Sequence, residues 1–308
     1  MSKLFDAIGK AKRERSAQSL QEDADFLTQP LEPVQSVWPV QTVRPFPVLQ
    51  PPPAPVSERM QPPKKQPKEG RFALPDDHLV SLTDPNSFEA EQYRALRHVI
   101  EQKHNDTGLS VVAVTSPVLG DGKTTTAINL AGALAQGKSS RVLLIDADLR
   151  RPSAAGQLRL AETQANEGFV AAISDPKLAL SDVVRLHRHY NLAFCPAGRP
   201  QTAPYELLKS PRVAELIDEA RRDYDFIVVD TPPVVSCPDC SLIEKHVDGF
   251  VMVVAAHRTP KKLVEDALGI VAPEKMLGLV WSGDSHRFRY YSAYGYSGRG
   301  RTGAKRKR

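Results

Sequence analysis

The chain has 308 residues, of which 41% are hydrophobic, and a net charge of +5. That apolar content suffices for one large or two small packed domains. The longest apolar runs, such as Val251–Ala256, are too short to cross a bilayer, and three cysteines do not make a disulfide framework. These features argue against a secreted mini-protein, an integral membrane protein and a collagen-like fibre, and they favour a cytoplasmic location.

Both ends of the chain differ in composition from its middle. Residues 1–20 alternate apolar and basic positions with helical spacing, which predicts an amphipathic helix that lies on an anionic membrane, docks on a partner or packs on its own domain. Twelve of the 26 prolines fall within residues 30–67, so we expect residues 21–75 to form a disordered, extended linker. Residues 286–308 hold eight Lys or Arg and no acid, which predicts a flexible basic tail behind a mildly acidic body.

The body, residues 76–285, is expected to be one α/β domain. A helix should begin near Asn86 or Ser87, both good N-caps, and run to about His104. Beyond it, short runs of Val, Ile and Leu alternate with helical patterns, which predicts a mostly parallel sheet with helices on both faces. The predicted strands are Leu109–Thr115, Val142–Asp146, Leu192–Pro196, Phe226–Asp230, Gly249–Ala256 and Leu277–Ser282.

The segment between the first of these strands and the next helix has the composition of a phosphate-binding loop. Gly120 and Gly122 allow a tight turn whose N–H groups can approach an oxyanion. Lys123 can reach the β- and γ-phosphates, and the Thr124 hydroxyl is placed for Mg²⁺. The expected nucleotide-binding residues are Gly120, Asp121, Gly122, Lys123, Thr124 and Thr125.

Carboxylates follow two other predicted strands. Asp146 and Asp148 end one strand, and Asp230 ends another. Ligands of open α/β sheets bind at this edge, so the three carboxylates should meet the phosphate loop there. These features together predict a P-loop NTPase fold that binds ATP and Mg²⁺, with Asp230 holding the Mg²⁺ shell.

These motifs resemble those of the bacterial tyrosine kinases (BY-kinases) of capsule and exopolysaccharide systems, in their separate cytoplasmic form. The resemblance covers residues 84–296 and implies an ATP-dependent protein-tyrosine kinase. The partition-type ATPases share the fold but carry a second loop lysine where this chain has Val118. The matching motifs are Thr115–Thr125, Ile145–Pro152, Pro196–Gly198, Pro204–Ser210 and Asp230–Pro233.

The resemblance also implies roles for residues outside the loop. Glu91, Arg94 and Arg97 match a Glu-x-x-Arg-x-x-Arg motif that mediates ring-like self-assembly; without the family, the first two are only an i,i+3 pair on a solvated helix. Ser282 stands where relatives usually have an Asn that contacts adenine. The tail tyrosines match the cluster that these kinases phosphorylate, and they are Tyr290, Tyr291, Tyr294 and Tyr296.

The expected reaction transfers phosphate from ATP·Mg²⁺ to a tail tyrosine of a neighbouring subunit. Asp146 is the first choice for the base that accepts the tyrosine proton, and Asp148 for metal support, but the sequence does not order these roles. Arg150 is expected to orient the pair. Cys237 and Cys240 have redox or zinc spacing, but one Cys-x-x-Cys is a weak signal.

The implied partners are a membrane polysaccharide co-polymerase, whose cytoplasmic tail activates the kinase at the inner face of the plasma membrane, and further copies of the chain in a ring. No nucleic acid is expected. Three alternatives stay open: an ATP-binding scaffold that switches assembly without phosphorylating tyrosine, a partition-type ATPase that positions cargo, and a tail that binds anionic polymer or lipid through Lys305–Arg308.

Overall fold

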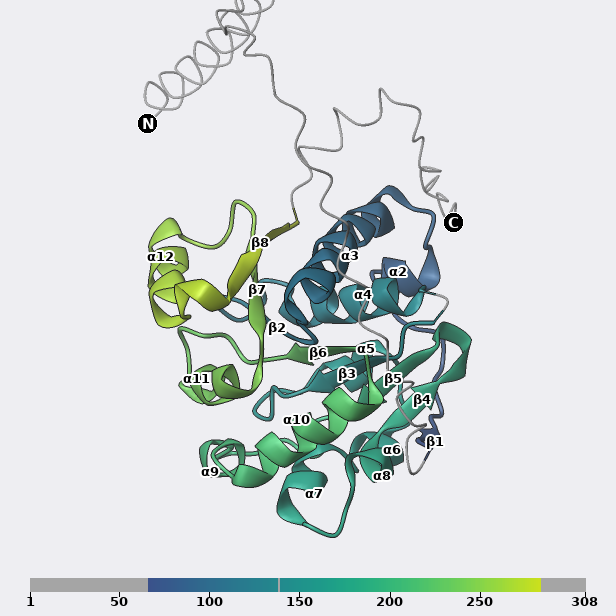
Figure 1. The fold of residues 1–308 in the computed structure, drawn as a ribbon. Coiled ribbons are helices and arrows are strands. Elements are labelled where there is room, and N and C mark those ends of the chain that lie inside the picture. The colour runs from purple at the N-terminus through teal and green to yellow at the C-terminus, as the bar shows by residue number, and fades with distance from the viewer. Residues whose placement is uncertain (1–65, 138, 284–308) are drawn as a thin grey trace, which may run out of the picture. The chain divides into compact units, whose positions relative to one another are not determined.

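The computed structural model describes residues 66–137 and 139–283. They form an eight-stranded sheet in the order β1-β4-β5-β3-β6-β2-β7-β8, with helices on both faces (Figure 1). The predicted helix at residues 1–20, most of the linker and the tail at 286–308 lie outside the described residues. No helix within the described ranges is long and apolar enough to cross a membrane.

Six neighbouring strands, from β5 to β8 in the sheet order, run parallel, as the sequence predicts, and β4 runs antiparallel to β5. The predicted strands are therefore confirmed, with bounds that differ by at most two residues. The strands are β1 (Lys68–Glu69), β2 (Val111–Thr115), β3 (Val142–Asp146), β4 (Arg185–His187), β5 (Leu192–Cys195), β6 (Phe226–Asp230), β7 (Gly249–Ala255) and β8 (Met276–Ser282).

Successive side chains along each strand point to opposite faces of the sheet, so the hydrophobic core lies on both faces. In β2, Val112 and Val114 pack under the helices α2 to α4, whereas Val111 and Ala113 face the layer that contains α7 to α12. Strands of this kind are buried on both sides and therefore read as continuous apolar runs. The helices are α2 (Val80–Thr83), α3 (Phe88–Thr107), α4 (Lys123–Ala135), α5 (Ala154–Gln157), α6 (Glu162–Ala165), α7 (Phe169–Ser174), α8 (Leu180–Val183), α9 (Tyr205–Leu208), α10 (Pro211–Asp223), α11 (Asp239–Ile243) and α12 (Lys261–Ile270).

The helix expected to begin near Ser87 is confirmed as α3. The Ser87 hydroxyl accepts a hydrogen bond from the Ala90 N–H at 3.2 Å, which satisfies one of the free donors of the first turn. At the other end, Gly108 adopts a left-handed conformation with φ of 74° and its N–H donates to the His104 carbonyl, the arrangement that commonly ends a helix.

The linker predicted over residues 21–75 overlaps the folded domain, so its predicted end is wrong. Strand β1 pairs with β4, and the Phe72 ring stacks on His187 with centroids 4.3 Å apart. Ala73 donates a backbone hydrogen bond to the Arg159 carbonyl at 3.0 Å. The sequence did not reveal this because β1 has two residues and β4 three, too few for a period to emerge.

Asp248 fastens the start of β2 to the loop before β7. Its carboxylate accepts hydrogen bonds from the N–H groups of Ser110 and Val111, both at 2.8 Å, and forms an ion pair with Arg221 at 2.7 Å. Burial alone would raise the pKa of Asp248, but the bonds from Arg221 and the two N–H groups outweigh it, and the pKa is lowered. The charged form of Asp248 therefore stabilises the fold.

We expect Asp248→Asn to lower the free energy of unfolding at neutral pH by about 1–2 kcal/mol, because the ion pair and the acceptor for two N–H groups are weakened. The lowered folded-state pKa means that this contribution is present above about pH 4 and is lost as the pH falls through that pKa. The urea midpoints of the unaltered chain and of Asp248→Asn should therefore become equal in acid. Asp218→Asn, at an exposed carboxylate nearby, is the matched control; equal unfolding midpoints for all three proteins at pH 7 would contradict the assignment.

Candidate nucleotide-binding site

The order of the strands brings the three predicted motifs together. Strand β6 lies between β3 and β2, so the phosphate loop after β2 and the acidic ends of β3 and β6 share one edge of the sheet. Asp146 and Asp230 are directly paired in register across β3 and β6. Parallel strands place their carboxyl ends at the same edge, which is where open α/β sheets bind ligands.

The phosphate loop is a close-fitting turn that ends at the first residue of α4. Gly120 and Gly122 have φ of 87° and 96°, values that favour glycine. A Cβ on Gly122 would also approach the Ser282 hydroxyl to 3.1 Å. Beside the loop lies a cavity of about 510 Å³, and the N-terminal end of α4 favours negative charge there. The cavity is lined by Leu119, Gly120, Gly122, Lys123, Thr124, Thr125, Asp148, Arg151, Pro152, Ser153 and Gln157.

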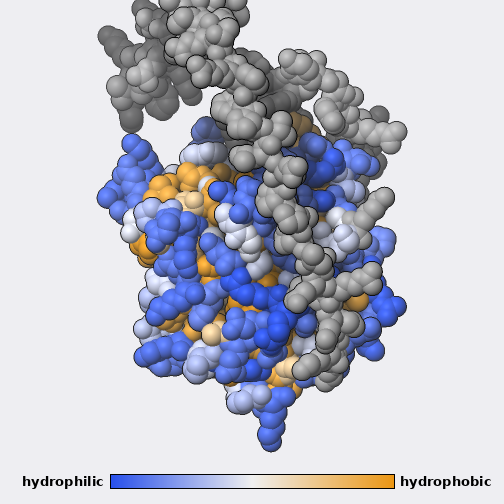
Figure 2. All heavy atoms as spheres, viewed as in Figure 1, coloured by the Kyte–Doolittle hydropathy of each residue, from blue (hydrophilic) through white to orange (hydrophobic). Residues whose placement is uncertain are grey.

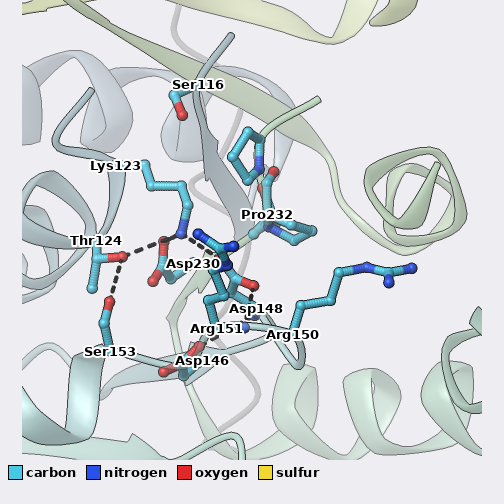
Figure 3. Close-up of polar contacts among 12 residues, drawn as sticks. Ser116, Lys123, Thr124, Asp146, Asp148, Arg150, Arg151, Ser153, Asp230 and Pro232 are labelled. Atoms are coloured by element: carbon cyan, nitrogen blue, oxygen red, sulfur yellow. Dashed lines mark hydrogen bonds and ion pairs between the residues drawn. The ribbon is translucent and has the colours of Figure 1, made fainter. Parts of the chain in front are cut away.

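The Lys123 ammonium lies among a group of buried carboxylates (Figure 3). Its Nζ lies 2.8 Å from Asp148 Oδ2 and 3.5 Å from Asp230 Oδ1. Burial on its own disfavours the ammonium, but the charges of Asp230 and Asp148 outweigh it, and the pKa of Lys123 is raised. Lys123 therefore stays charged and neutralises part of the acidic group.

Asp146 is fully buried, and its two carboxylate oxygens accept hydrogen bonds from the N–H groups of Asp148 and Ala154, both at 3.2 Å. Burial, followed by the charge of Asp230, raises the pKa of Asp146 well above its usual value. One lysine cannot offset three carboxylates at this depth, and protonation of Asp146 relieves the remaining repulsion.

Asp230 has the features of a metal ligand. Both of its carboxylate oxygens are buried and accept no hydrogen bond from the residues that the structure describes, which is costly for an ionised group unless cations balance it. The Thr124 hydroxyl lies in the same site, 3.3 Å from Lys123 Nζ and 3.1 Å from the Ser153 hydroxyl. The donors are oxygens, as Mg²⁺ prefers.

No cluster of three or more His, Cys, Asp or Glu side chains able to hold a metal occurs among the residues that the structure describes. Mg²⁺ in nucleotide sites is usually held by one or two protein oxygens together with substrate phosphates. Thr124 and Asp230 therefore fit an ion that arrives with the nucleotide, rather than a resident metal held by protein alone. The P-loop fold and this donor set indicate nucleotide binding with a divalent metal.

Comparison with known proteins agrees with this geometry. Residues 109–243 match a family model described as an AAA domain. The tyrosine-protein kinase YwqD of Bacillus subtilis (strain 168) is 33% identical over 72% of this chain and 91% of its own length. This chain belongs to the bacterial tyrosine-protein kinases. The tyrosine-protein kinase CpsD of Streptococcus agalactiae is 29% identical over 68% of this chain and 90% of its own length.

Solved structures and longer relatives extend the comparison. The chimerical protein CapA2B2 is 28% identical, with a TM-score of 0.61 over 70% of this chain and 93% of that chain. The succinoglycan biosynthesis transport protein ExoP of Rhizobium meliloti (strain 1021) is 32% identical over 65% of this chain, but the match spans 26% of ExoP. The matched part of this chain therefore corresponds to about a quarter of ExoP.

The structure contradicts the expectation that Arg150 orients Asp146 and Asp148. The Arg150 guanidinium points away from both (Figure 3) and donates to the two oxygens of Asp239 at 2.6 and 2.9 Å. Asp239 is buried at the start of α11. The two N–H donors of the Arg150 guanidinium therefore pair with a carboxylate that would otherwise lack a counter-ion. Arg151, its neighbour, lines the phosphate cavity instead.

Glu91, Arg94 and Arg97 all make contacts within the chain. Arg94 pairs with Glu91 and donates to the Pro85 carbonyl. Arg97 donates to Glu101 at 2.8 Å and to the Ala133 carbonyl at 2.9 Å, which ties α3 to the end of α4. The side chains of Glu91, Arg94 and Arg97 are 46%, 36% and 22% exposed, so all three still reach the surface, and their role in self-assembly stays a prediction.

A second set of contacts supports the phosphate loop from its other side, and the sequence analysis did not include it. Asp121 is 1% exposed, and its carboxylate accepts hydrogen bonds from the Thr259 hydroxyl at 2.6 Å and the Val118 N–H at 3.3 Å. Arg258 donates to the Gly120 carbonyl. The Asp121 side chain thus connects the phosphate loop to Thr259, whereas the Asp121 backbone forms part of the loop itself. The Ser282 hydroxyl adds a further contact to the loop, since it donates to the Asp121 carbonyl at 2.6 Å.

We expect Thr259→Val to weaken ATP binding by about tenfold, because it removes a hydrogen bond to a buried carboxylate that holds the loop's shape. Thr259→Ser keeps the hydroxyl and should bind ATP as the unaltered chain does. Isothermal titration calorimetry of the three proteins makes the comparison. Equal dissociation constants for the valine and serine variants would show that the contact does not position the loop.

Proposed function

We propose that the chain is an ATP-dependent protein-tyrosine autokinase that phosphorylates Tyr290, Tyr291, Tyr294 and Tyr296 of a neighbouring copy. The observation that carries the proposal is the placement of Lys123 among Asp146, Asp148 and Asp230 at the mouth of a phosphate loop. Phosphoryl transfer depends chiefly on positioning and charge neutralisation, and these residues supply both. Membership of a kinase family, in which YwqD and CpsD are named tyrosine-protein kinases, supports the choice of tyrosine.

In this mechanism the loop N–H groups and Lys123 hold the phosphates of ATP. Thr124 and Asp230 are the residues that would hold Mg²⁺, which supplies neutralisation of the phosphate charge when bound. An electron pair of the tyrosine oxygen forms a bond to the γ-phosphorus, the bond from that phosphorus to ADP breaks, and the phenol proton passes to a carboxylate. A phenol has a pKa near 10, so a carboxylate positioned for this proton helps the transfer.

Asp148 is better supported than Asp146 as the carboxylate that meets the tyrosine. Asp148 borders the phosphate cavity, whereas Asp146 has no exposed surface and both of its oxygens are engaged by backbone N–H groups. This reverses the first choice made from the sequence. Asp146 is paired in register with Asp230. It is better suited to set the charge of the buried part of the site than to contact a substrate.

The wider proposal is that phosphorylation regulates the polymerisation and export of an exopolysaccharide or capsule. ExoP, a succinoglycan biosynthesis transport protein, contains a segment similar to this chain. A membrane polysaccharide co-polymerase is the proposed activator, which would recruit the kinase to the inner face of the plasma membrane, and a ring of copies joined through Glu91, Arg94 and Arg97 is the proposed assembly. The runner-up function is an ATP-binding scaffold that assembles without phosphorylating tyrosine.

We expect the purified chain, incubated with ATP and Mg²⁺ with and without a co-polymerase tail peptide, to gain phosphate on the tyrosines of residues 286–308, as read by mass spectrometry. Lys123→Met removes the phosphate-binding ammonium and should lower the rate by at least about a hundredfold. Lys262→Met, on the exposed side of α12, is the matched control. Nucleotide binding with no phosphotyrosine in any condition would favour the scaffold.

Charge on the tail should control assembly. Each phosphate adds about −1.5 to −2, so four would add about −6 to −8 and nearly cancel the eight cations of residues 286–308. A chain with Glu at all four tail tyrosines should therefore form smaller assemblies than one with Phe at all four. Light scattering after size-exclusion chromatography measures the masses, and identical masses would contradict the charge account.

A further inference from the structure

The Cys-x-x-Cys motif at the start of α11 has the backbone geometry of a pair that can form a disulfide. Cys237 directly precedes Pro238, the N-cap of α11, and Cys240 lies in the first turn of that helix. Pro238 has φ of −74° and ψ of −4°, and Asp239 is helical. Two intervening residues with helical angles place the Cα atoms of the cysteines roughly 5 Å apart. A disulfide requires about 4.4–6.8 Å between these atoms, so the bond needs little movement of the backbone.

The two thiols also contact the same short segment of the chain. The Cys240 thiol donates to the Thr115 hydroxyl at 3.7 Å, and its sulfur lies 3.8 Å from the Thr231 hydroxyl. The Cys237 thiol donates to the Pro233 carbonyl at 3.5 Å. Thr231 and Pro233 are two residues apart, just after the end of β6. Both sulfur atoms therefore lie against one three-residue segment.

Cys237 is the cysteine of this pair that a small reagent can reach. It is partly exposed, whereas Cys240 is buried, and it lines a second cavity of about 440 Å³. This second cavity adjoins the phosphate cavity, because Leu119, Asp148 and Arg151 line both. Its volume is in the range of cavities that take small ligands, so it admits a molecule as small as hydrogen peroxide. The second cavity is lined by Leu119, Asp148, Arg150, Arg151, Pro232, Pro233, Ser236, Cys237 and Pro238.

The surroundings of both thiols make their oxidation slow at neutral pH. Burial, followed by the charge of Asp239, raises the pKa of Cys237; Asp148 adds to the increase, while the Asp239 N–H and the charge of Arg150 oppose it. Burial raises the pKa of Cys240 to about 11, and a negative charge on Cys237 adds to that increase. The thiolate is the reactive form of cysteine. The pair is therefore suited to respond to sustained exposure to an oxidant.

Cys240 connects two strand ends that build the nucleotide site. Thr115 is the last residue of β2, directly before the phosphate loop, and Thr231 directly follows β6. The Thr115 hydroxyl accepts a hydrogen bond from Cys240 and donates one to the Pro232 carbonyl at 3.0 Å. A disulfide would remove the hydrogen that Cys240 donates and would draw its sulfur to about 2.05 Å from that of Cys237. The bond would therefore disturb the contacts that join the phosphate loop to the end of β6.

We propose that Cys237 and Cys240 are an oxidation site, at which hydrogen peroxide forms a reversible disulfide that weakens the binding of ATP and Mg²⁺. The Cys237 thiolate attacks one peroxide oxygen, the O–O bond breaks, and the other oxygen leaves as hydroxide, which takes up a proton to give water. Cys240 then loses its proton and attacks the sulfur of the Cys237 sulfenic acid, so that the S–S bond forms, the S–O bond breaks and a second water leaves.

In this reaction two thiols are oxidised to one disulfide, and one peroxide is reduced to two waters. The proposal concerns the nucleotide site alone. It holds whether or not the chain phosphorylates tyrosine.

Mass spectrometry of the full chain tests whether the disulfide forms. Trypsin cuts after Arg222 and Lys245, so one peptide, residues 223–245, contains both cysteines of the pair and no other. After treatment with excess hydrogen peroxide, and blocking of the remaining thiols in denaturant, we expect this peptide to have lost two hydrogen atoms and to regain them with dithiothreitol. The buried Cys195 should keep its free thiol in the same sample.

Isothermal titration calorimetry with ATP and Mg²⁺ tests the consequence. The oxidised chain should bind ATP at least about threefold more weakly than the reduced chain. Dithiothreitol should restore the affinity, and because it does not reduce oxidised methionine, the recovery assigns the effect to the disulfide.

Cys237→Ser is the matched control, because its hydroxyl can still donate to the Pro233 carbonyl but cannot form a disulfide. The reduced variant should bind ATP as the unaltered chain does, which also reports correct folding. Peroxide should change its dissociation constant by less than about 1.5-fold.

The outcomes separate this proposal from the kinase proposal. Peroxide that adds oxygen to Cys237 without linking it to Cys240, or equal ATP affinities of the disulfide and dithiol forms, would overturn the oxidation site and leave the kinase function standing. A disulfide that weakens ATP binding in a chain that never phosphorylates its tail would confirm the oxidation site and count against the kinase. A reduced chain that binds no ATP would overturn both the proposed effect of the disulfide and the proposed function.

Discussion

The ammonium of Lys123 among three buried carboxylates is the interaction on which the site depends. Ionised groups at this depth are costly unless they are paired, and Lys123 pairs directly with Asp148 and Asp230. Burial, followed by the charge of Asp230, raises the pKa of Asp146, and one ammonium faces three carboxylates. A further cation would relieve this imbalance. The negative charges that destabilise the domain without nucleotide therefore favour the binding of a nucleotide that arrives with Mg²⁺.

The sheet makes this concentration of charge possible. Asp146 and Asp230 occupy paired positions on adjacent parallel strands, and the apolar residues on both faces hold those strands in place (Figure 2 shows hydrophilic residues on the face in view, with hydrophobic patches among them). Such a sheet is readable from sequence because each of its strands is a continuous apolar run. The strand ends, the loop glycines and the capping serine of α3 were predictable for the same reason: each is a local pattern.

What the sequence could not predict are contacts between residues far apart along the chain. Thr259 and Asp121 are 138 positions apart, and Arg150 meets Asp239 across 89; nothing near either residue signals its partner. The sequence could not order the roles of Asp146 and Asp148 for a related reason. Two residues apart on one strand end, they have the same chemistry in sequence, and only burial and hydrogen bonding distinguish them. Strands β1 and β4 were too short to show any period.

The adjoining cavities divide the demands of tyrosine phosphorylation between two kinds of surface. Backbone N–H groups and Lys123 suit a highly charged phosphate chain, whereas the prolines after β6 and before α11 suit a ring. The two surfaces meet at Asp148, whose carboxylate lies 2.8 Å from the Lys123 ammonium. Asp148 therefore belongs to both surfaces, and its contact with Lys123 connects the wall of the second cavity to the charges of the phosphate loop.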